Sequence, residues 1–295
     1  MRITNRLLAD HLVYNLQKTS QRMDELQVQL ASGKRITNPS DDPSGTKNAM
    51  ELRSALNAVG QYQRNVADAQ SWLQTTDQAL QSFNDLLNRA RELAVAGANN
   101  TLPLDAREAI AQEVESVRQF AIQTANTSQG NRHVFGGLRT TTPPFTETAG
   151  VVNYNGDGGH MNREVDPSTS MSVNITGTEL NNGAPDLFQT LTNLANDIRN
   201  ANVNSISGTR IGELEQVSTN IQTLRTVVGA KANRLSETEQ TLEGTSVNFS
   251  DLLSKAEDLD MARAITDLRT AQASYQMALQ VGAKIIPQTL VDFLR

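Results

Sequence analysis

Apolar residues recur at every seventh position between Ser44 and Ala98. One series holds Leu52, Val59, Val66, Leu73, Leu80, Leu87 and Ala94, and a second, three residues later, holds Ala55, Tyr62, Ala69, Thr76, Phe83 and Ala90. A seven-residue repeat keeps one stripe facing a neighbouring helix only when the helices supercoil with a left hand. A continuous helix over this stretch would be about 80 Å long. The pattern therefore predicts a rod whose apolar stripe must be covered by other helices.

Two later segments carry stripes that could cover it. Between about Thr209 and Leu259 the seven-residue series is Leu214, Ile221, Val228, Leu235, Leu242, Phe249 and Ala256, and the segment 106–128 carries Ile110, Val114, Val117, Ala121 and Thr124. Asp105 with Glu108 resembles a capping box at the start of the shorter helix. Three segments with matching stripes predict an extended helical bundle.

Both ends of the chain carry a further stripe whose steps alternate between four and three residues. The first stripe holds Leu12, Leu16, Thr19, Met23, Leu26 and Leu30, and the second holds Met261, Ile265, Leu268, Gln272, Tyr275, Leu279, Gly282, Ile286, Thr289 and Phe293. Gly33 should end the first helix, and Asp42 with Pro43 should open the long rod as N-cap and first-turn proline. The second stripe starts out of register with the rod before it, so we expect junctions near 33–43 and 258–262.

The middle of the chain differs in composition, because nine of the 18 glycines lie in residues 130–183. Three short segments there are strand-like, namely Val151–Tyr154, Arg163–Val165 and Met171–Ile175, and Asn155–Gly159 is turn-like. They predict a small β-rich domain. Helix should resume near Asp186 and break at Ser207-Gly208.

The expected fold class is therefore mainly α, with long coiled-coil rods, discontinuous terminal helices and a small inserted β-rich domain. The expected boundaries give a terminal coiled-coil domain in two parts, 1–38 and 258–295, a rod domain in two parts, 39–130 and 186–257, and an inserted domain, 131–185.

Charge and composition exclude several classes of function. The net charge is −6, from 26 basic and 32 acidic residues of interspersed sign, whereas a nucleic-acid-binding protein usually shows a basic patch. The chain has no cysteine for disulfides or thiolate chemistry. No stretch approaches the roughly 20 apolar residues of a membrane span, and the first residues lack the apolar run of a cleaved secretory signal. Nucleic acid and membrane insertion are not expected.

Two groups of residues at the predicted junctions resemble signatures of the flagellin family of bacterial flagellar axial proteins. The first group is Leu30–Ile36 followed by Asp41, Asp42 and Gly45, and the second is Glu257, Asp258, Asp260 and Ala262 followed by Gln272 and Gln276. Asn88–Val95 also resembles a stretch of the flagellin rod. Within the family, three segments resemble proteins of the hook–filament junction more than filament subunits: Asn38–Pro43, Val134–Gly137 with Pro143–Phe145, and Tyr154–Asp157 with Arg163–Val165.

This resemblance implies a structural protein without catalysis, cofactor or metal. Its terminal helices would pair as an antiparallel coiled coil lining the inner tube of a helical assembly of subunits. The implied partners are further copies of the chain, hook-associated protein 1 on one side and flagellin on the other. Export would pass through the flagellar type III apparatus without a cleaved signal, with a cytosolic chaperone on the C-terminal helix, so the protein would be extracellular.

The stripes at the two ends supply the candidate assembly residues. These are Leu12, Leu16, Met23, Leu26, Leu30, Ile265, Leu268, Tyr275, Leu279, Ile286 and Phe293. The candidate hinge and signature residues are Gly33, Asp41, Asp42, Pro43, Asp258 and Asp260.

Other functions compete with this one. The same residues fit a flagellin that builds the filament itself, or, from a different class, a secreted soluble coiled-coil effector or binding module. The terminal helices could also complete a bundle within one chain. Asn88–Val95 resembles a flagellin segment recognised by an innate immune receptor, although a charged rod surface explains it as well.

Three motifs point to chemistry and have simpler explanations. Asn153, Asn155, Asp157 and Glu164 fit the spacing of an EF-hand calcium loop, but strands flank them and a β-hairpin turn is expected. Ser44-x-x-Lys47 fits a penicillin-recognising motif without its companion motifs. The carboxylates at 41–42 and 257–260 could form acid–base pairs, but a helix cap and a solvated hinge explain them. His11, His133 and His160 are too scattered for a metal site.

Overall fold

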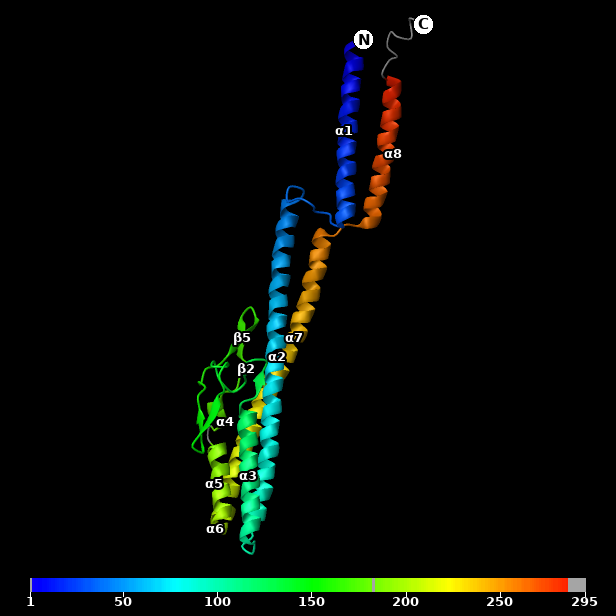
Figure 1. Ribbon diagram of the computed structural model, residues 1–295. Coiled ribbons are helices and arrows are strands. Elements are labelled where there is room, and N and C mark those ends of the chain that lie inside the picture. The colour runs from blue at the N-terminus through cyan, green and yellow to red at the C-terminus, as the bar shows by residue number, and fades with distance from the viewer. Residues whose placement is uncertain (1, 182–183, 286–295) are drawn as a thin grey trace. The chain divides into compact units, whose positions relative to one another are not determined.

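The computed structural model describes residues 2–181 and 184–285 (Figure 1). The helices are α1 (Arg2–Ser32), α2 (Pro43–Gly97), α3 (Leu104–Ala125), α4 (Gly177–Leu180), α5 (Leu187–Arg199), α6 (Val203–Ser205), the π-helical turn η1 (Ile206–Arg210), α7 (Ile211–Glu257) and α8 (Met261–Ile285). The strands are β1 (Ser128–Gln129), β2 (Arg132–His133), β3 (Phe145–Thr148), β4 (Val151–Tyr154), β5 (Asn162–Asp166) and β6 (Thr169–Ser172). The mainly α fold class with a small β-containing middle region is confirmed.

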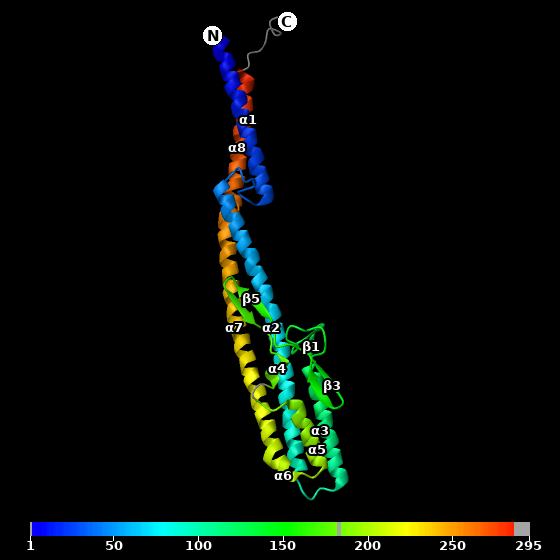
Figure 2. The same ribbon diagram turned by 90° about the vertical axis from the view of Figure 1, so that its left-hand side faces the viewer.

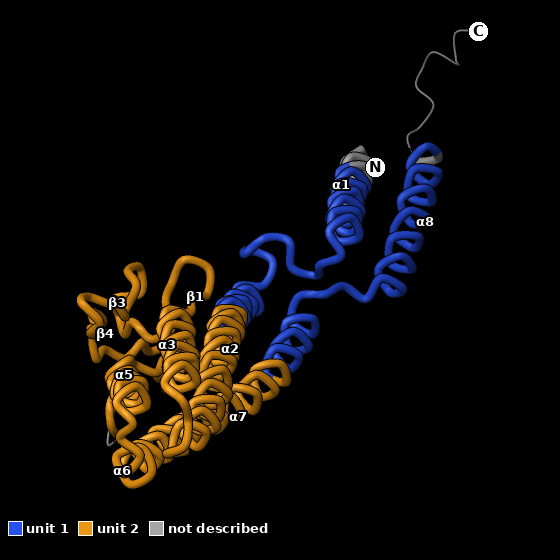
Figure 3. The backbone as a smooth tube through the Cα atoms, turned by 60° about the horizontal axis from the view of Figure 1, so that its bottom comes forward, with its two compact units in different colours: residues 1–58, 245–295 blue, residues 59–244 orange. Residues whose placement is uncertain are grey.

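The chain folds as two compact units (Figure 3). Unit 1 combines residues 1–58 with 245–295, and unit 2 is the continuous stretch 59–244. Both divisions fall inside a helix, in α2 and in α7, whereas the sequence places its junctions at the breaks between helices. The two units are described separately below.

In unit 2, α2 and α7 run side by side in opposite directions (Figures 1 and 2). Ion pairs fix this register, with Arg91 2.6 Å from Glu215 and Arg225 3.0 Å from Asp77. The predicted stripes form the core, since the following members are buried: Val59, Val66, Ala69, Leu73, Thr76, Leu80, Phe83, Leu87, Ala90 and Ala94 of α2, and Leu214, Ile221, Val228, Leu235 and Leu242 of α7. Val217 and Leu224 of α7 are buried as well.

Helices α3 and α5 pack against each other in the same unit. The apolar face of α5 is buried through Phe188, Leu191, Leu194 and Ile198, and the carboxylate of its N-cap, Asp186, accepts a hydrogen bond from the amide of Gln189. This helix begins where the sequence predicts.

Two expected details of these helices are wrong. The predicted break at Ser207-Gly208 lies inside η1, which continues into α7, and the chain turns instead around Ala201, where φ is 55°. The predicted capping box is absent: α3 follows Pro103 without a side-chain cap, and Glu108 pairs with Arg199 of α5 at 3.1 Å. The helix begins at Leu104, so Asp105 lies in its first turn and is not its N-cap.

The middle region contains three antiparallel hairpins, β1–β2, β3–β4 and β5–β6. The ring of Phe145 on β3 contacts the rings of Tyr154 on β4 and Phe188 on α5 in a tilted arrangement, with centroids 5.1 and 5.3 Å away. The hairpin turn expected at Asn155–Gly159 is therefore wrong, because β4 pairs backwards with β3. The segment instead crosses between hairpins, and the Asp157 carboxylate accepts hydrogen bonds from the amides of Leu138 and Gly159.

Candidate assembly site

In unit 1, α1 and α8 lie side by side (Figures 1 and 2). On α1, Leu26 is buried, and the half-buried members of the same stripe are Leu12, Leu16, Thr19, Met23 and Leu30. On α8, Ala264, Ala271 and Gly282 are buried, and Leu268, Tyr275 and Ala278 are half-buried. The α8 face thus steps by four and three along a line of mostly small residues.

This line differs from the stripe that the sequence singles out. The two share Leu268, Tyr275 and Gly282, but Ile265 and Leu279 are 41% and 47% exposed. Small residues allow the helices to approach closely: a Cβ added to Gly282 would lie 2.5 Å from Cδ2 of Leu12. The larger side chains are consequently left on the adjacent face of α8. The candidates Ile286 and Phe293 lie outside the described residues.

The α1–α8 pair exposes many large apolar side chains. Between 41% and 62% of the surface of each is accessible in Leu7, Val13, Tyr14, Val28, Met261, Ile265, Met277, Leu279 and Val281. Large apolar side chains left exposed in such number along one helix pair favour an interaction site.

The two junctions of unit 1 are hydrogen-bonded to each other. Lys34 and Asp258 form an antiparallel β-bridge, in which the Arg35 amide donates to the Glu257 carbonyl at 2.7 Å and the Leu259 amide donates to the Gly33 carbonyl at 3.0 Å. Gly33 has a φ of 71°, as its predicted place after the end of α1 requires. The bridge ties the connection after α1 to the connection before α8.

The loop before α2 is organised by two carboxylates. Asp41 accepts from the amide of Asn38 at 2.8 Å, which lowers its pKa. Asp42 accepts from the amide of Gly45 at 2.9 Å, which lowers its pKa as well and places it as the cap of α2, whose first residue is Pro43. These carboxylates are used structurally.

Arg35 and Asp260 complete the junction. The Arg35 guanidinium contacts the Asp42 carboxylate at 3.2 Å and the Ala256 carbonyl at 2.9 Å, and so joins the α2 cap to the end of α7. Asp260 accepts from the amide of Arg263 at 3.1 Å and caps α8, while Asp258 accepts from the hydroxyl of Ser254.

The solvated hinge expected for the carboxylates at 257–260 is wrong for Glu257. Glu257 is 7% exposed, and its carboxylate lies 3.0 Å from Nζ of Lys34 and also pairs with Arg53. The three residues come from different segments: Lys34 from the loop after α1, Arg53 from the first part of α2 and Glu257 from the end of α7. Glu257 and Asp258 both belong to the second signature group, but nothing in a single sequence indicates which of the two is buried.

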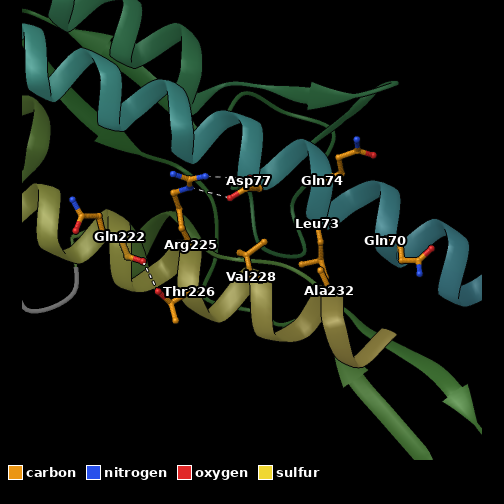
Figure 4. A pocket seen from close by; sticks show the side chains of 10 residues that line it. Gln70, Leu73, Gln74, Asp77, Gln222, Arg225, Thr226, Val228 and Ala232 are labelled. Atoms are coloured by element: carbon orange, nitrogen blue, oxygen red, sulfur yellow. Dashed lines mark hydrogen bonds and ion pairs between the residues drawn. The ribbon is translucent and has the colours of Figure 1, made fainter. Parts of the chain in front are cut away.

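A second candidate site lies in unit 2, where a groove of about 590 Å³ opens between α2 and α7 (Figure 4). Leu73 and Val228 form its floor, and glutamine side chains of both helices line it. Its two ionisable side chains, Asp77 and Arg225, are paired with each other. The groove could therefore bind a ligand through hydrogen bonds and a matching shape, and its lining does not favour acid–base chemistry.

The motifs that suggested chemistry are used otherwise. The Ser44 hydroxyl donates to Asp42 at 2.9 Å, and Lys47 lies 3.8 Å from Glu51. Asp157 of the calcium-like motif accepts hydrogen bonds from the backbone amides of Leu138 and Gly159. Among the residues that the structure describes, no three histidine or carboxylate side chains gather as metal ligands. In the same part of the chain, no helix is both long and apolar enough to cross a membrane.

Comparison with known proteins gives matches at both ends of the chain. Residues 3–139 match the family profile of the bacterial flagellin N-terminal helical region, and residues 211–294 match that of the bacterial flagellin C-terminal helical region. The chain is 33% identical over 153 residues to flagellar hook-associated protein 3 of Escherichia coli strain K12, covering 52% of this chain and 48% of that protein. The match therefore spans about half the length of this relative.

Two further comparisons extend over more of the chain. It is 27% identical over 276 residues to flagellin FlaB2 of Treponema pallidum strain Nichols, covering 90% of each protein. The crystal structure of flagellar hook-associated protein 3 from Legionella pneumophila superposes with a TM-score of 0.65 at 15% identity, covering 70% of this chain and 98% of that one. The last match shows a shared fold.

Proposed function

The chain belongs to the flagellin family of bacterial flagellar proteins, and on that premise we propose that it is a non-catalytic structural subunit at the hook–filament junction. The similarity to hook-associated protein 3 of Escherichia coli favours the junction over the filament, because the identity is 33% there and 27% to the Treponema flagellin. The observation that carries an assembly role is the apolar surface of the α1–α8 pair.

This surface argues for polymerisation by its energetics. Full burial of one leucine-sized side chain is worth about 1.5–3 kcal/mol. Nine large apolar side chains that are at least 41% exposed therefore represent a strong driving force toward neighbours that cover them. In the proposed assembly, α1 and α8 of each copy pack against those of adjacent copies through this surface.

The finer parts of the proposal follow from family membership. The subunit would contact hook-associated protein 1 on the hook side and flagellin on the filament side. It would leave the cell unfolded through the flagellar type III apparatus, accompanied until then by a chaperone on its C-terminal helix, and would reside in the extracellular flagellum.

Substitution of Leu279 by aspartate tests the assembly surface. Leu279 is 47% exposed, so Leu279→Asp should leave the monomer folded and abolish sedimentable assemblies, because a carboxylate would be buried at every contact. Val151→Asp is the matched control, since Val151 is 53% exposed on β4 of the inserted region. Circular dichroism measures whether the monomer is folded, and sedimentation measures whether it assembles. Normal assembly by Leu279→Asp would contradict the role of this face.

Leu26→Asp gives a complementary result. Leu26 is 8% exposed between α1 and α8, so the charge should separate these helices as well as block assembly, while unit 2 stays folded.

A filament subunit is the second candidate, favoured by the match to the Treponema flagellin over 90% of each chain. A filament subunit should polymerise alone into long tubes, whereas a junction subunit should form limited assemblies unless its partners are supplied. Electron microscopy of purified protein distinguishes the two. A subunit that stays monomeric even with its partners would favour the soluble coiled-coil alternative.

A further inference from the structure

A groove in unit 1 lies beside the junction, and Leu279 of α8 is not among the residues that line it. It has a volume of about 490 Å³ and is lined by the end of α1, the loop before α2, the first turns of α2 and the end of α7. Its apolar lining includes Val28, Ile36, Ala49 and Met50, of which Val28 and Met50 are 53% and 62% exposed. A monomer thus leaves Val28 and Met50 in contact with water.

The groove carries a net positive charge. Lys34 and Arg53 line it together with Glu257, so two cations face one carboxylate. The side chains of Lys34 and Arg53 are 41% and 47% exposed, and they remain available to a further acidic group. The groove therefore suits an apolar side chain that has a carboxylate beside it.

Such a combination occurs on α7 of the same unit. Val247 is 64% exposed, and Ser250 and Asp251 follow one turn later on the same side of the helix. Asp251 lies 2.7 Å from Lys255, but both side chains are at least 60% exposed, so this pair can be exchanged at little cost in free energy. Val247 lies on the exposed side of α7, about 160° around the helix from the half-buried Phe249.

The two surfaces of one copy cannot meet. Val247 and Glu257 belong to one continuous helix, in which ten residues separate them by about 15 Å along the axis. A contact between the groove and the Val247 side therefore requires two molecules. Because the surfaces differ, the contact joins copies head to tail, and such contacts repeat into rings or helices.

We propose that the junction groove of one copy receives the Val247 side of α7 from a second copy of the chain. The proposal rests on the proposed axial function, because it supplies that assembly with a specific contact between copies. Val28 belongs both to the groove and to the exposed side of α1, so this contact continues the assembly surface of the terminal helices.

Disulfide trapping tests this contact directly, because the chain has no cysteine of its own. Two single variants, Met50→Cys and Val247→Cys, are mixed and oxidised, both as concentrated subunits and as sedimented assemblies. The matched control mixes Met50→Cys with Val95→Cys, since Val95 is 60% exposed on the surface of α2. The Met50–Val247 product should exceed the control product at least about tenfold, because the proposed contact holds these two positions, and not Met50 and Val95, beside each other.

The results separate this contact from the function on which it rests. Equal yields of the two mixed products would overturn the proposal, as would a dominant Met50–Met50 product, which indicates a symmetric contact. Wild-type assembly without the Met50–Val247 product overturns the contact and leaves the axial function standing. Trapping in concentrated solution without any sedimentable assembly supports the contact and counts against the axial function. Val247→Asp should reduce assembly while Val95→Asp does not.

Discussion

At the scale of single residues, the junction is held by carboxylates whose native partners stabilise their charged form. The amide of Asn38 lowers the pKa of Asp41, and the amide of Gly45 lowers the pKa of Asp42, with help from the hydroxyl of Ser44. A carboxylate whose pKa is lowered in the folded protein adds to the free energy of unfolding. This contribution is complete above the ordinary pKa of 3.8 and is lost as the pH falls through the lowered pKa of the folded protein.

We therefore expect the loop before α2 to open in acid. Amide signals of Asn38 and Gly45 in nuclear magnetic resonance spectra should report loss of their hydrogen bonds as the pH falls below 3.8, the ordinary carboxyl value. In Asp42→Asn the neutral amide oxygen can still accept from Gly45, so that signal should lose its acid transition while the Asn38 signal keeps its own. Identical titrations in both proteins would show that Asp42 does not control the loop.

Buried charge at the junction marks a limit of sequence reasoning. The helix cap at Asp42 and the left-handed position of Gly33 follow from local rules and are present in the structure. The burial of Glu257 between Lys34 and Arg53 depends on segments more than 200 residues apart, as does the contact of Arg35 with the Ala256 carbonyl. Local patterns contain no information on such pairs.

At the scale of elements, the sequence predicts large apolar stripes well and small-residue faces poorly. The seven-residue series of α2 and α7 form the core of unit 2, because a repeat of large apolar side chains along one side of a helix is buried when a second such helix packs against it. On α8 the buried line runs through Ala264, Ala271 and Gly282, and hydrophobic periodicity gives such residues little weight. The sequence locates β4 but not its partner. This strand pairs with β3, which precedes it, rather than with the strand after Asn155–Gly159, and strand-like composition does not determine the partner.

The small-residue line predicts that bulk at Gly282 separates the terminal helices. Gly282→Leu would force a side chain into the space of Leu12, and overpacking typically costs about 1–3 kcal/mol. We expect lower helicity and faster amide exchange in α1 and α8, with the thermal midpoint of unit 2 unchanged. Ala283→Leu is the matched control, because Ala283 is exposed on the same helix turn. Equal effects of the two variants would show that Gly282 does not face α1.

At the scale of the whole molecule, the two units differ in how much of their structure a single copy can stabilise. Unit 2 contains fully buried aromatic and aliphatic side chains, including Phe83, Phe135, Leu191 and Leu214. In the described part of the α1–α8 pair, the buried hydrophobic residues are Leu26, Ala264 and Ala271. Local opening follows the density of buried contacts, so the terminal pair should open well before unit 2 unfolds.

Limited proteolysis by trypsin tests this difference and its relation to assembly. In the free subunit, cleavage at Lys18, Arg22, Arg263 and Arg269 of the terminal pair should precede cleavage at Arg91 and Arg234 in unit 2, and the trimmed core should stay helical. Assembly should slow the terminal cleavages selectively, since neighbours would then cover the apolar faces of α1 and α8. If the terminal sites of the free subunit resist as long as Arg91, the pair is complete within one chain. Its exposed apolar side chains would then need another partner, and the soluble coiled-coil alternative would gain over the axial function.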